Sequence, residues 1–431
     1  MRHTPRWMLA AALSAAIVAI PTAAQADGSN WWYDYYSVAD AHAAGWTGKG
    51  VTVAVIDGGI NPELPVFDGA DLTVDPAGIC EAADGTPLPA SSTDMAVSFH
   101  GSNVTAVIVG SGKGASAIRG IAPDADLRFY GMGNASGSPC LGEKSFGDAI
   151  DKAVADGAKI ITTSVGWSGA TNRAIQSVTN ALAHGVIVLA AAPNSQLDTG
   201  PYPGKLNGVV LGSAYGRTGD IESDEHAKDE KAITPEATVV APGDDLLLIG
   251  DRTTGDWNAS VDGSGTSIAT PIVAGILADV WQKYPKATSN QIIQSMIHNT
   301  TATDHPLLRD TEMGYGYGPI SLGHLLRVDP RQYPDVNPLM DKKLGIPTAK
   351  ELAATKADIA AGREPRARKP SSFDGYAALD AHAAPSPLLW WVAGGVGALL
   401  LIAAAAVVVV IVTVRRRRRQ TDGVDGTGGT A

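Results

Sequence analysis

Residues 263–271 read Gly-Ser-Gly-Thr-Ser-Ile-Ala-Thr-Pro and lead into an apolar segment that ends at Trp281. Four aliphatic side chains recur every four residues and share one face of a helix: Ile268, Ile272, Ile276 and Val280. Pro271 is tolerated because it falls in the first turn, where its missing N–H is not needed. Ser267 is therefore a hydroxyl at a helix N-terminus, where unpaired N–H groups favour a developing negative charge. The segment predicts either a nucleophile beside an oxyanion site or a Ser/Thr cap on a buried helix.

Short apolar runs rich in β-branched residues alternate with helical patterns along the chain. We expect strands at 51–56, 126–130, 160–165, 186–192, 209–212 and 238–240. Because helices separate these runs, they predict a parallel α/β sheet covered by helices on both faces. Asp57 directly follows the first run, at the end of the strand where open α/β sheets bind their ligands. The alternative is that Asp57 is only a turn residue.

His100 and Gly101 precede another apolar segment, 104–109, which we expect to form a helix. A histidine at such a position suits catalysis, and the alternative is a surface histidine whose hydrogen bonds are satisfied. With Asp57 and Ser267, His100 supplies the residue types of a catalytic triad. Serine needs a base because it is a weak nucleophile, and a buried carboxylate fixes the tautomer of that base.

Five motifs follow one another in the chain. They are Val-Ala-Val-Ile-Asp-Gly-Gly at 53–59, His-Gly-Ser at 100–102, Gly-Ile-Ala-Pro at 120–123, Val-Ala-Pro-Gly at 240–243 and Gly-Thr-Ser-Ile-Ala-Thr-Pro at 265–271. Together and in this order they resemble the subtilisin-like serine protease family over roughly residues 45–325. The resemblance implies a three-layer α/β fold with a central, mostly parallel seven-stranded sheet. It also implies that Asp57, His100 and Ser267 hydrolyse protein or peptide substrates through an acyl-enzyme.

The same resemblance implies two further groups of site residues. The Asn194 side-chain amide would share an oxyanion hole with the Ser267 N–H. Ser164, Val165 and Gly166 match the segment that pairs with an extended substrate backbone. The sequence holds no Cys/His cluster with metal-ligand spacing and no phosphate-binding glycine motif, so we expect no cofactor. Calcium at the charge-rich loop 220–231 is the alternative to a solvated surface there.

Three residues depart from the family pattern. Gly58 replaces the hydroxyl residue that usually follows the catalytic Asp, and Asn103 replaces the family's second histidine. Pro193 stands where the family has glycine before the oxyanion Asn, and it restricts the backbone of Ala192. The departures leave an alternative function open, that of a catalytically weak or inactive structural component of a secretion complex.

Both ends of the chain indicate export and membrane anchoring. Residues 1–26 combine a basic start, an apolar run and Ala-Gln-Ala before Asp27, the pattern of a signal peptide. Residues 388–414 carry no charge and are long enough to span a bilayer, and five arginines at 415–419 follow at once. We therefore expect a single-pass protein of the cell membrane, with its catalytic domain on the extracytoplasmic side.

We expect six parts along the chain. The first three are a signal peptide at 1–26, a short N-terminal extension at 27–50 and a peptidase domain at 51–330. They are followed by a linker or stalk at 331–387 with one helix at 348–361, a transmembrane helix at 388–414 and a cytoplasmic basic tail at 415–431. This layout resembles that of mycosins, the membrane-anchored proteases of type VII secretion systems. The resemblance implies a type VII secretion complex as a partner. The aromatic cluster at 31–36 either packs on the domain or grips a partner.

The part of the chain between signal peptide and anchor is acidic. Residues 27–387 hold 26 Lys and Arg against 42 Asp and Glu, a formal charge of −16. This charge argues against nucleic acid as a partner. Cys80 and Cys140 predict one disulfide, because the exported compartment permits it and the count is even. Two free thiols are the alternative.

Overall fold

The computed structural model describes residues 30–76, 78–81, 86–133, 143–166, 171–196, 202–301 and 304–364. The expected signal peptide, transmembrane helix and basic tail lie outside these ranges, and so does Cys140. Within the ranges, no helix has both the length and the apolarity needed to cross a bilayer. The membrane anchor and the Cys80–Cys140 disulfide therefore stay predictions.

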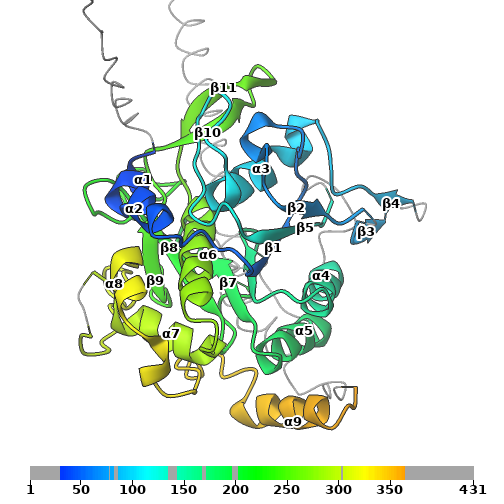
Figure 1. Ribbon diagram of the computed structural model, residues 1–431, viewed down its shortest axis with the longest axis vertical. Coiled ribbons are helices and arrows are strands. Elements are labelled where there is room, and N and C mark those ends of the chain that lie inside the picture. The colour runs from blue at the N-terminus through cyan, green and yellow to red at the C-terminus, as the bar shows by residue number, and fades with distance from the viewer. Residues whose placement is uncertain are drawn as a thin grey trace, which may run out of the picture.

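Seven strands form one sheet at the centre of the molecule (Figure 1). In spatial order they are β2 Leu72–Val74, β5 Asp126–Gly131, β1 Thr52–Asp57, β6 Ile160–Thr163, β7 Ile187–Ala191, β8 Val210–Tyr215 and β9 Val239–Pro242. Each strand is parallel to its neighbours. The structure thereby confirms the expected seven-stranded parallel sheet.

Side chains of the central strands alternate between two cores, because successive residues of a strand point to opposite faces. In β1, Val53 and Val55 belong to one core, whereas Ala54 and Ile56 belong to the other. Strands buried on both faces need apolar residues at every position. This is why the run at 51–56 is continuously apolar.

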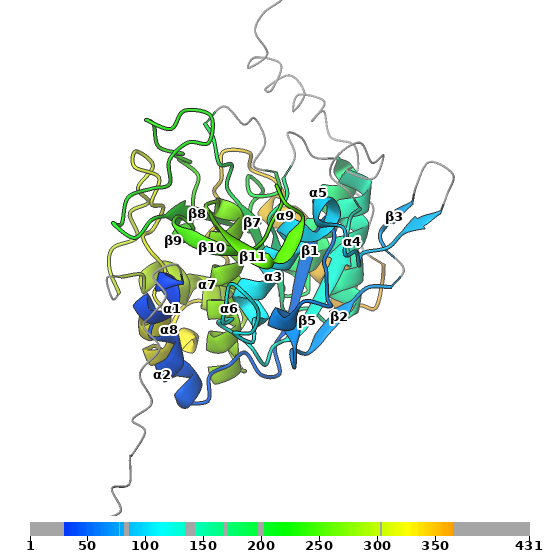
Figure 2. The same ribbon diagram turned by 90° about the horizontal axis from the view of Figure 1, so that it is seen from above.

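Helices cover both faces of the sheet (Figure 2). The core of one face includes residues of α3 Met95–Val109, α6 Thr266–Lys283 and α7 Ser289–His298. The other face carries α4 Glu143–Ala155 and α5 Asn172–Ala183, with α9 Ala349–Ala360 against α5. α3 begins earlier than expected, because the Asp94 side chain accepts the N–H of Ala96 and so caps the helix before His100.

Two hairpins lie outside the main sheet. One joins β3 Cys80–Glu81 to β4 Pro87–Leu88, and the other joins β10 Leu246–Asp251 to β11 Asp256–Gly263. The second hairpin leads directly into α6, so its position influences the start of that helix. Further short elements are η1 Pro65–Phe67, α8 Leu322–Arg327 and η2 Pro330–Gln332.

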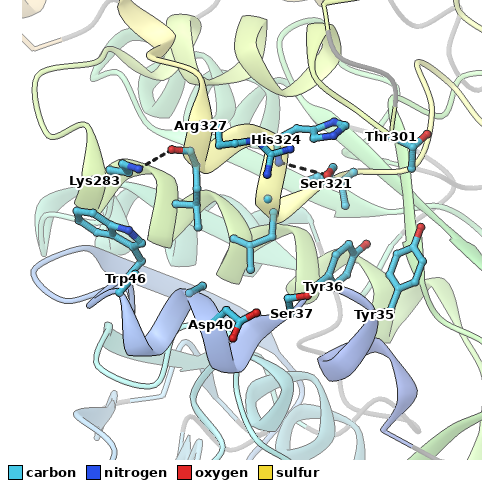
Figure 3. A pocket seen from close by; sticks show the side chains of 16 residues that line it. Tyr35, Tyr36, Ser37, Asp40, Trp46, Lys283, Thr301, Ser321, His324 and Arg327 are labelled. Atoms are coloured by element: carbon cyan, nitrogen blue, oxygen red, sulfur yellow. Dashed lines mark hydrogen bonds between the residues drawn. The ribbon is translucent and has the colours of Figure 1, made fainter.

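The N-terminal extension forms α1 Trp31–Tyr35 and α2 Val38–Ala43, which lie beside α8 in Figures 1 and 2. Trp32 and Val38 are buried in the same core as α6. The aromatic cluster therefore packs on the domain, the first of its two interpretations. Between α2 and α8 lies a pocket of about 640 Å³, with Trp46, Lys283 and Arg327 among its lining residues (Figure 3).

The domain continues beyond residue 330, where composition predicted that a linker or stalk begins. Leu339 and Ile346 are buried in the two cores. The buried Lys342 donates from Nζ to two backbone carbonyl oxygens of the domain. The boundary expected at 330 is wrong because single side chains and polar contacts, rather than a periodic apolar face, hold this segment. α9 confirms the helix expected at 348–361, and residues 365–387 lie outside the described ranges.

Candidate active site

A buried carboxylate holds a histidine ring at the end of β1. Asp57 is the last residue of that strand and is 1% exposed. Both of its carboxylate oxygens lie 2.9 Å from His100 Nδ1. Oδ1 also accepts the N–H of Gly58 at 2.8 Å. A buried charge requires such partners, and these contacts satisfy the carboxylate while they fix the orientation of the ring.

His100 lies in the second turn of α3, which packs unusually close to the end of β1. A Cβ on the next residue, Gly101, would lie 2.2 Å from the carbonyl oxygen of Gly59, so only glycine allows this approach. Burial lowers the pKa of His100, but the charge and hydrogen bond of Asp57 raise it, and the net pKa is raised despite Arg252. Because 43% of the side chain remains exposed, we expect Asp57 rather than burial to dominate. Nδ1 donates to Asp57, which leaves Nε2 of the neutral ring as an acceptor.

Ser267 is the second residue of α6, and its hydroxyl is joined to the end of β6. Ser267 Oγ donates to the carbonyl oxygen of Ser164 at 3.3 Å, and Ser164 Oγ donates to the carbonyl oxygen of Ser267 at 2.7 Å. Within the described residues, no hydrogen bond joins Ser267 to His100. In this conformation the Ser267 hydroxyl is therefore bonded to a backbone carbonyl and not to the histidine acceptor that a triad requires.

Sheet register places these two pairs next to each other. β1 and β6 are neighbours, and Ile56 is the register partner of Thr163. Asp57 and Ser164 are the next residues of the two strands' paths, so they lie side by side at the carboxyl edge of the sheet, where neighbouring strands are about 4.8 Å apart. Asp57 is hydrogen-bonded to His100, and Ser164 is hydrogen-bonded to Ser267. Residues more than 200 positions apart in the chain are thereby brought to one edge.

Asn194 follows β7 and faces the start of α6. Its Oδ1 accepts the N–H of Thr266 at 3.0 Å and lies 2.9 Å from the Thr266 hydroxyl. The Thr266 N–H needs an acceptor, and this fixes which atom of the amide is oxygen. Asn194 Nδ2 and the Ser267 N–H have no hydrogen-bond acceptor among the described residues. A Cβ on Gly265 would lie 3.7 Å from Ser267 N, 3.8 Å from Asn194 Nδ2 and 3.7 Å from Asn194 Oδ1, so both donors lie close to one point beside Gly265.

The three residues expected to pair with substrate follow β6 and continue past the sheet. Ser164 and Val165 are half-buried, and Gly166 is exposed. The N–H of Val165 lies 3.4 Å from the Thr163 hydroxyl, which is a long hydrogen bond. A carbonyl oxygen of a bound peptide could replace this hydroxyl as the acceptor. The hydrogen bonds of Ser164 to Ser267 were not expected from the sequence.

One of the three departures from the family pattern, Asn103, has a structural explanation. The Asn103 amide is buried, accepts the N–H of Ile249 at 2.7 Å and donates to the Ile249 carbonyl at 3.1 Å. It therefore ties the histidine helix to β10. At Gly58 the backbone N–H supplies a hydrogen bond to Asp57. Pro193 is compatible with the contact between Asn194 and Thr266.

One buried acidic residue near the start of α6, Glu222, was not found from the sequence. Glu222 is 5% exposed, and its Oε2 has no hydrogen-bond partner among the described residues. Burial first, and then the charges of Asp244 and Glu225, raise the pKa of Glu222 to about 8, although Lys228 and the Thr266 N–H oppose the shift. No local sequence pattern marks a carboxyl that becomes buried only through tertiary packing.

The described residues bear on two further expectations, those for metal binding and for a disulfide. Among the residues that the structure describes, no group of three or more His, Cys, Asp or Glu is placed to hold a metal ion. Cys80 is buried beside Met132. Its expected partner, Cys140, lies outside the described residues.

Comparison with known proteins finds similarity in sequence and fold to one family. The profile of the subtilase family, peptidase S8, matches residues 48–318. A thermostable alkaline protease of Halalkalibacterium halodurans is 28% identical over 295 residues, which cover 68% of this chain and 72% of that protein. Subtilisin DY of Bacillus licheniformis is 28% identical over 269 residues, 61% of this chain and 87% of the relative. The fold of a Pseudoalteromonas arctica protease superposes with a TM-score of 0.56 at 22% identity, over 69% of this chain and 96% of that one.

Proposed function

Because the chain belongs to the subtilase family of serine proteases, we propose that Asp57, His100 and Ser267 form its catalytic triad. The observation that carries the proposal is the Asp57–His100 contact, in which a buried carboxylate holds Nδ1 at 2.9 Å. That contact leaves His100 Nε2 free to act as a base. The chain is a subtilisin-like serine endopeptidase, so its substrates are proteins or peptides.

The first chemical step begins when the Ser267 hydroxyl leaves its hydrogen bond to Ser164 and turns toward His100. The Ser267 proton points to the Ser164 carbonyl over a long hydrogen bond of 3.3 Å. When the hydroxyl turns to His100 Nε2, the base takes the proton as Oγ attacks the scissile carbonyl carbon. Asp57 stabilises the imidazolium that forms but does not accept the proton.

The tetrahedral intermediate places a negative charge on the former carbonyl oxygen. The space bordered by Ser267 N–H and Asn194 Nδ2 fits this oxyanion, because both donors have no acceptor among the described residues. His100 then returns its proton to the leaving amine, and the C–N bond breaks to give the acyl-enzyme. In the second half of the reaction, His100 takes a proton from a water molecule as the water attacks the ester carbonyl. His100 then returns the proton to Ser267 Oγ as the ester C–O bond breaks, which releases the acid product. The substrate backbone would extend along Ser164, Val165 and Gly166, which follow the carboxyl end of β6 beyond the sheet.

We test the triad by peptide hydrolysis with purified full-length protein. Ser267→Ala should remove hydrolysis, whereas Ser260→Ala should match wild type because Ser260 is an exposed serine of β11. Hydrolysis that is equal in wild type and Ser267→Ala would refute the assignment.

The membrane part of the proposal rests on the sequence. Residues 388–414 without charge, followed by five arginines, support one C-terminal anchor with the domain outside the cytoplasm. The layout further supports association with a type VII secretion complex. Deletion of 388–431 should release the domain from the membrane fraction, and retention of the truncated chain there would contradict the anchor.

A second function is favoured by the hydrogen bond from Ser267 to Ser164 in place of His100. In this alternative the protein is a catalytically weak structural component of the secretion complex. Ser267→Ala would then leave secretion intact, while deletion of the anchor would abolish it. Loss of secretion in Ser267→Ala alone would exclude this function.

A further inference from the structure

The N-terminal extension precedes the residues that match the subtilase profile, 48–318, yet it reaches a loop beside Ser267. The indole N–H of Trp31, in α1, donates to the carbonyl oxygen of Asp244 at 3.2 Å. Its ring meets Tyr215 edge-on with centroids 6.1 Å apart, and the Arg217 guanidinium lies 5.8 Å from the ring centroid. Trp31 is therefore held against the end of β8 while it contacts Asp244.

Asp244 belongs to a loop that holds the residues in front of α6. The Gly243 carbonyl accepts the N–H of Gly265 at 2.7 Å. Asp244 Oδ1 accepts from the Ser264 hydroxyl and from the N–H of Asp245. Both residues that precede Thr266 are thus bonded to the loop that Trp31 contacts.

Neighbouring atoms leave this loop little room to move, and one of its residues has a left-handed backbone conformation. A Cβ on Gly243 would lie 2.9 Å from the carbonyl oxygen of Gly265. Asp245 has a φ of 55°, in the left-handed region, which Asp adopts at a modest cost that contacts around the residue can offset. The hydrogen bond from Trp31 to Asp244, one residue earlier, is one of these surrounding contacts.

The position of the loop determines the geometry of the oxyanion space. Gly265 borders that space, since its Cβ position lies 3.7 Å from Ser267 N and 3.8 Å from Asn194 Nδ2. Donors stabilise an oxyanion when they are held in place before the reaction. A displacement of about 1 Å at a catalytic group can cost about 10²-fold in rate. A small shift at 264–265 is therefore enough to affect catalysis.

We propose that Trp31 is a positioning residue for the oxyanion hole, which it fixes through Asp244 and Gly265. The N-terminal extension is then part of the catalytic apparatus and more than a cover for the core. The proposal rests on the proposed roles of Ser267 and Asn194. Trp31 itself does not contact the reacting atoms and acts only through the loop.

The test compares two conservative variants of the same helix in the full-length chain. Trp31→Phe keeps an aromatic ring but removes the N–H that Asp244 accepts. Tyr33→Phe is the control, because the Tyr33 hydroxyl faces His42 Nδ1 at 3.4 Å and not the loop. We expect Trp31→Phe to lower kcat for peptide hydrolysis about three- to tenfold, the size of one lost hydrogen bond. KM should change by less than about twofold in both variants, and Tyr33→Phe should keep the wild-type kcat.

A double-mutant cycle separates positioning from general stability. In an Asn194→Ala background the oxyanion hole has already lost one donor, so Trp31→Phe should lower kcat by less than about twofold there. The same three- to tenfold loss in both backgrounds would show that Trp31 acts elsewhere and would overturn the proposal. An unchanged kcat in Trp31→Phe would overturn it as well.

Failure of the proposed function gives a different result. Ser267→Ala would then hydrolyse peptides like wild type, which removes both the triad and this inference. If only the inference fails, Ser267→Ala is inactive while Trp31→Phe is fully active.

Discussion

Glu222→Gln perturbs a carboxyl that is buried next to the start of α6. Glu222 is 5% exposed, and burial together with the nearby Asp244 and Glu225 raises its pKa from 4.5 to about 8. Below about pH 4.5 the group is protonated in both the folded and the unfolded chain. Between about 4.5 and 8 the unfolded chain ionises while the folded protein keeps its proton, so stability falls as pH rises and reaches its minimum above the folded pKa.

The magnitude follows from the same values. At about 1.4 kcal/mol per pKa unit, the interval from 4.5 to about 8 corresponds to at most about 5 kcal/mol. Glutamine has nearly the same volume and no charge to ionise. We therefore expect Glu222→Gln to gain stability relative to wild type as pH rises, by on the order of 2–4 kcal/mol between about pH 4 and pH 8.

Urea unfolding of the purified full-length protein at several pH values measures this difference. Glu312→Gln is the matched control, because Glu312 is an exposed glutamate on a loop. Any hydrogen bond that glutamine gains or loses shifts stability equally at all pH values, so the pH dependence of the difference is the signal. A difference between Glu222→Gln and wild type that stays constant from about pH 4 to pH 8 would refute the reasoning, since Glu222 would then ionise like a solvated glutamate.

Three further predictions concern the candidate site. Asp57→Asn should lower kcat by about 10⁴-fold, because the asparagine no longer fixes the His100 tautomer, and a loss below about tenfold in steady-state kinetics would argue against that role. Because the pKa of His100 is raised, kcat/KM should rise with pH through an inflection above the ordinary histidine value of 6.5. Asp57→Asn removes the charge that raises this pKa, so it should move the inflection to lower pH in a pH–rate profile. An inflection that does not move would contradict the contribution of Asp57. Asn103→Ala should destabilise the protein by about 2–3 kcal/mol in urea unfolding, because Ile249 loses both hydrogen bonds to the buried amide, and a change under about 0.5 kcal/mol would show that water replaces it.

Elements that bury apolar surface continuously could be predicted from the sequence. β1 was expected at 51–56 and runs from Thr52 to Asp57, and β7 was expected at 186–192 and runs from Ile187 to Ala191. In both, the local pattern and the tertiary burial agree. The order of motifs likewise predicted that Asp57 and His100 would meet, although these residues lie 43 positions apart.

Elements held by long-range polar contacts could not be predicted in this way. β11 alternates between exposed and half-buried residues, and the amide of Asn103 ties its partner strand β10 to α3. Asn103 reads in the sequence as a departure from a catalytic motif, whereas its bonds to Ile249 show a structural role. The segment after residue 330 is held on the domain by buried Leu339 and Ile346, and two apolar residues do not form a periodic pattern.

The candidate site likewise has features that could be predicted from the sequence and contacts that could not. The residue types and order of the triad were visible in the sequence. The contact between Ser164 and Ser267 spans 103 positions, and that between Trp31 and Asp244 spans 213. Neither pair has a local signature, because each contact exists only after the sheet and the extension are in place.

The central claim is that His100 activates Ser267, and labelling with a fluorophosphonate probe tests it most directly. Mass spectrometry of the peptide that contains Ser267 identifies the modified residue, and the labelling rate measures its activation. We expect an adduct on Ser267 in wild type and a labelling rate at least about 10²-fold lower in His100→Ala. No adduct on Ser267, or equal labelling rates in wild type and His100→Ala, would contradict the claim.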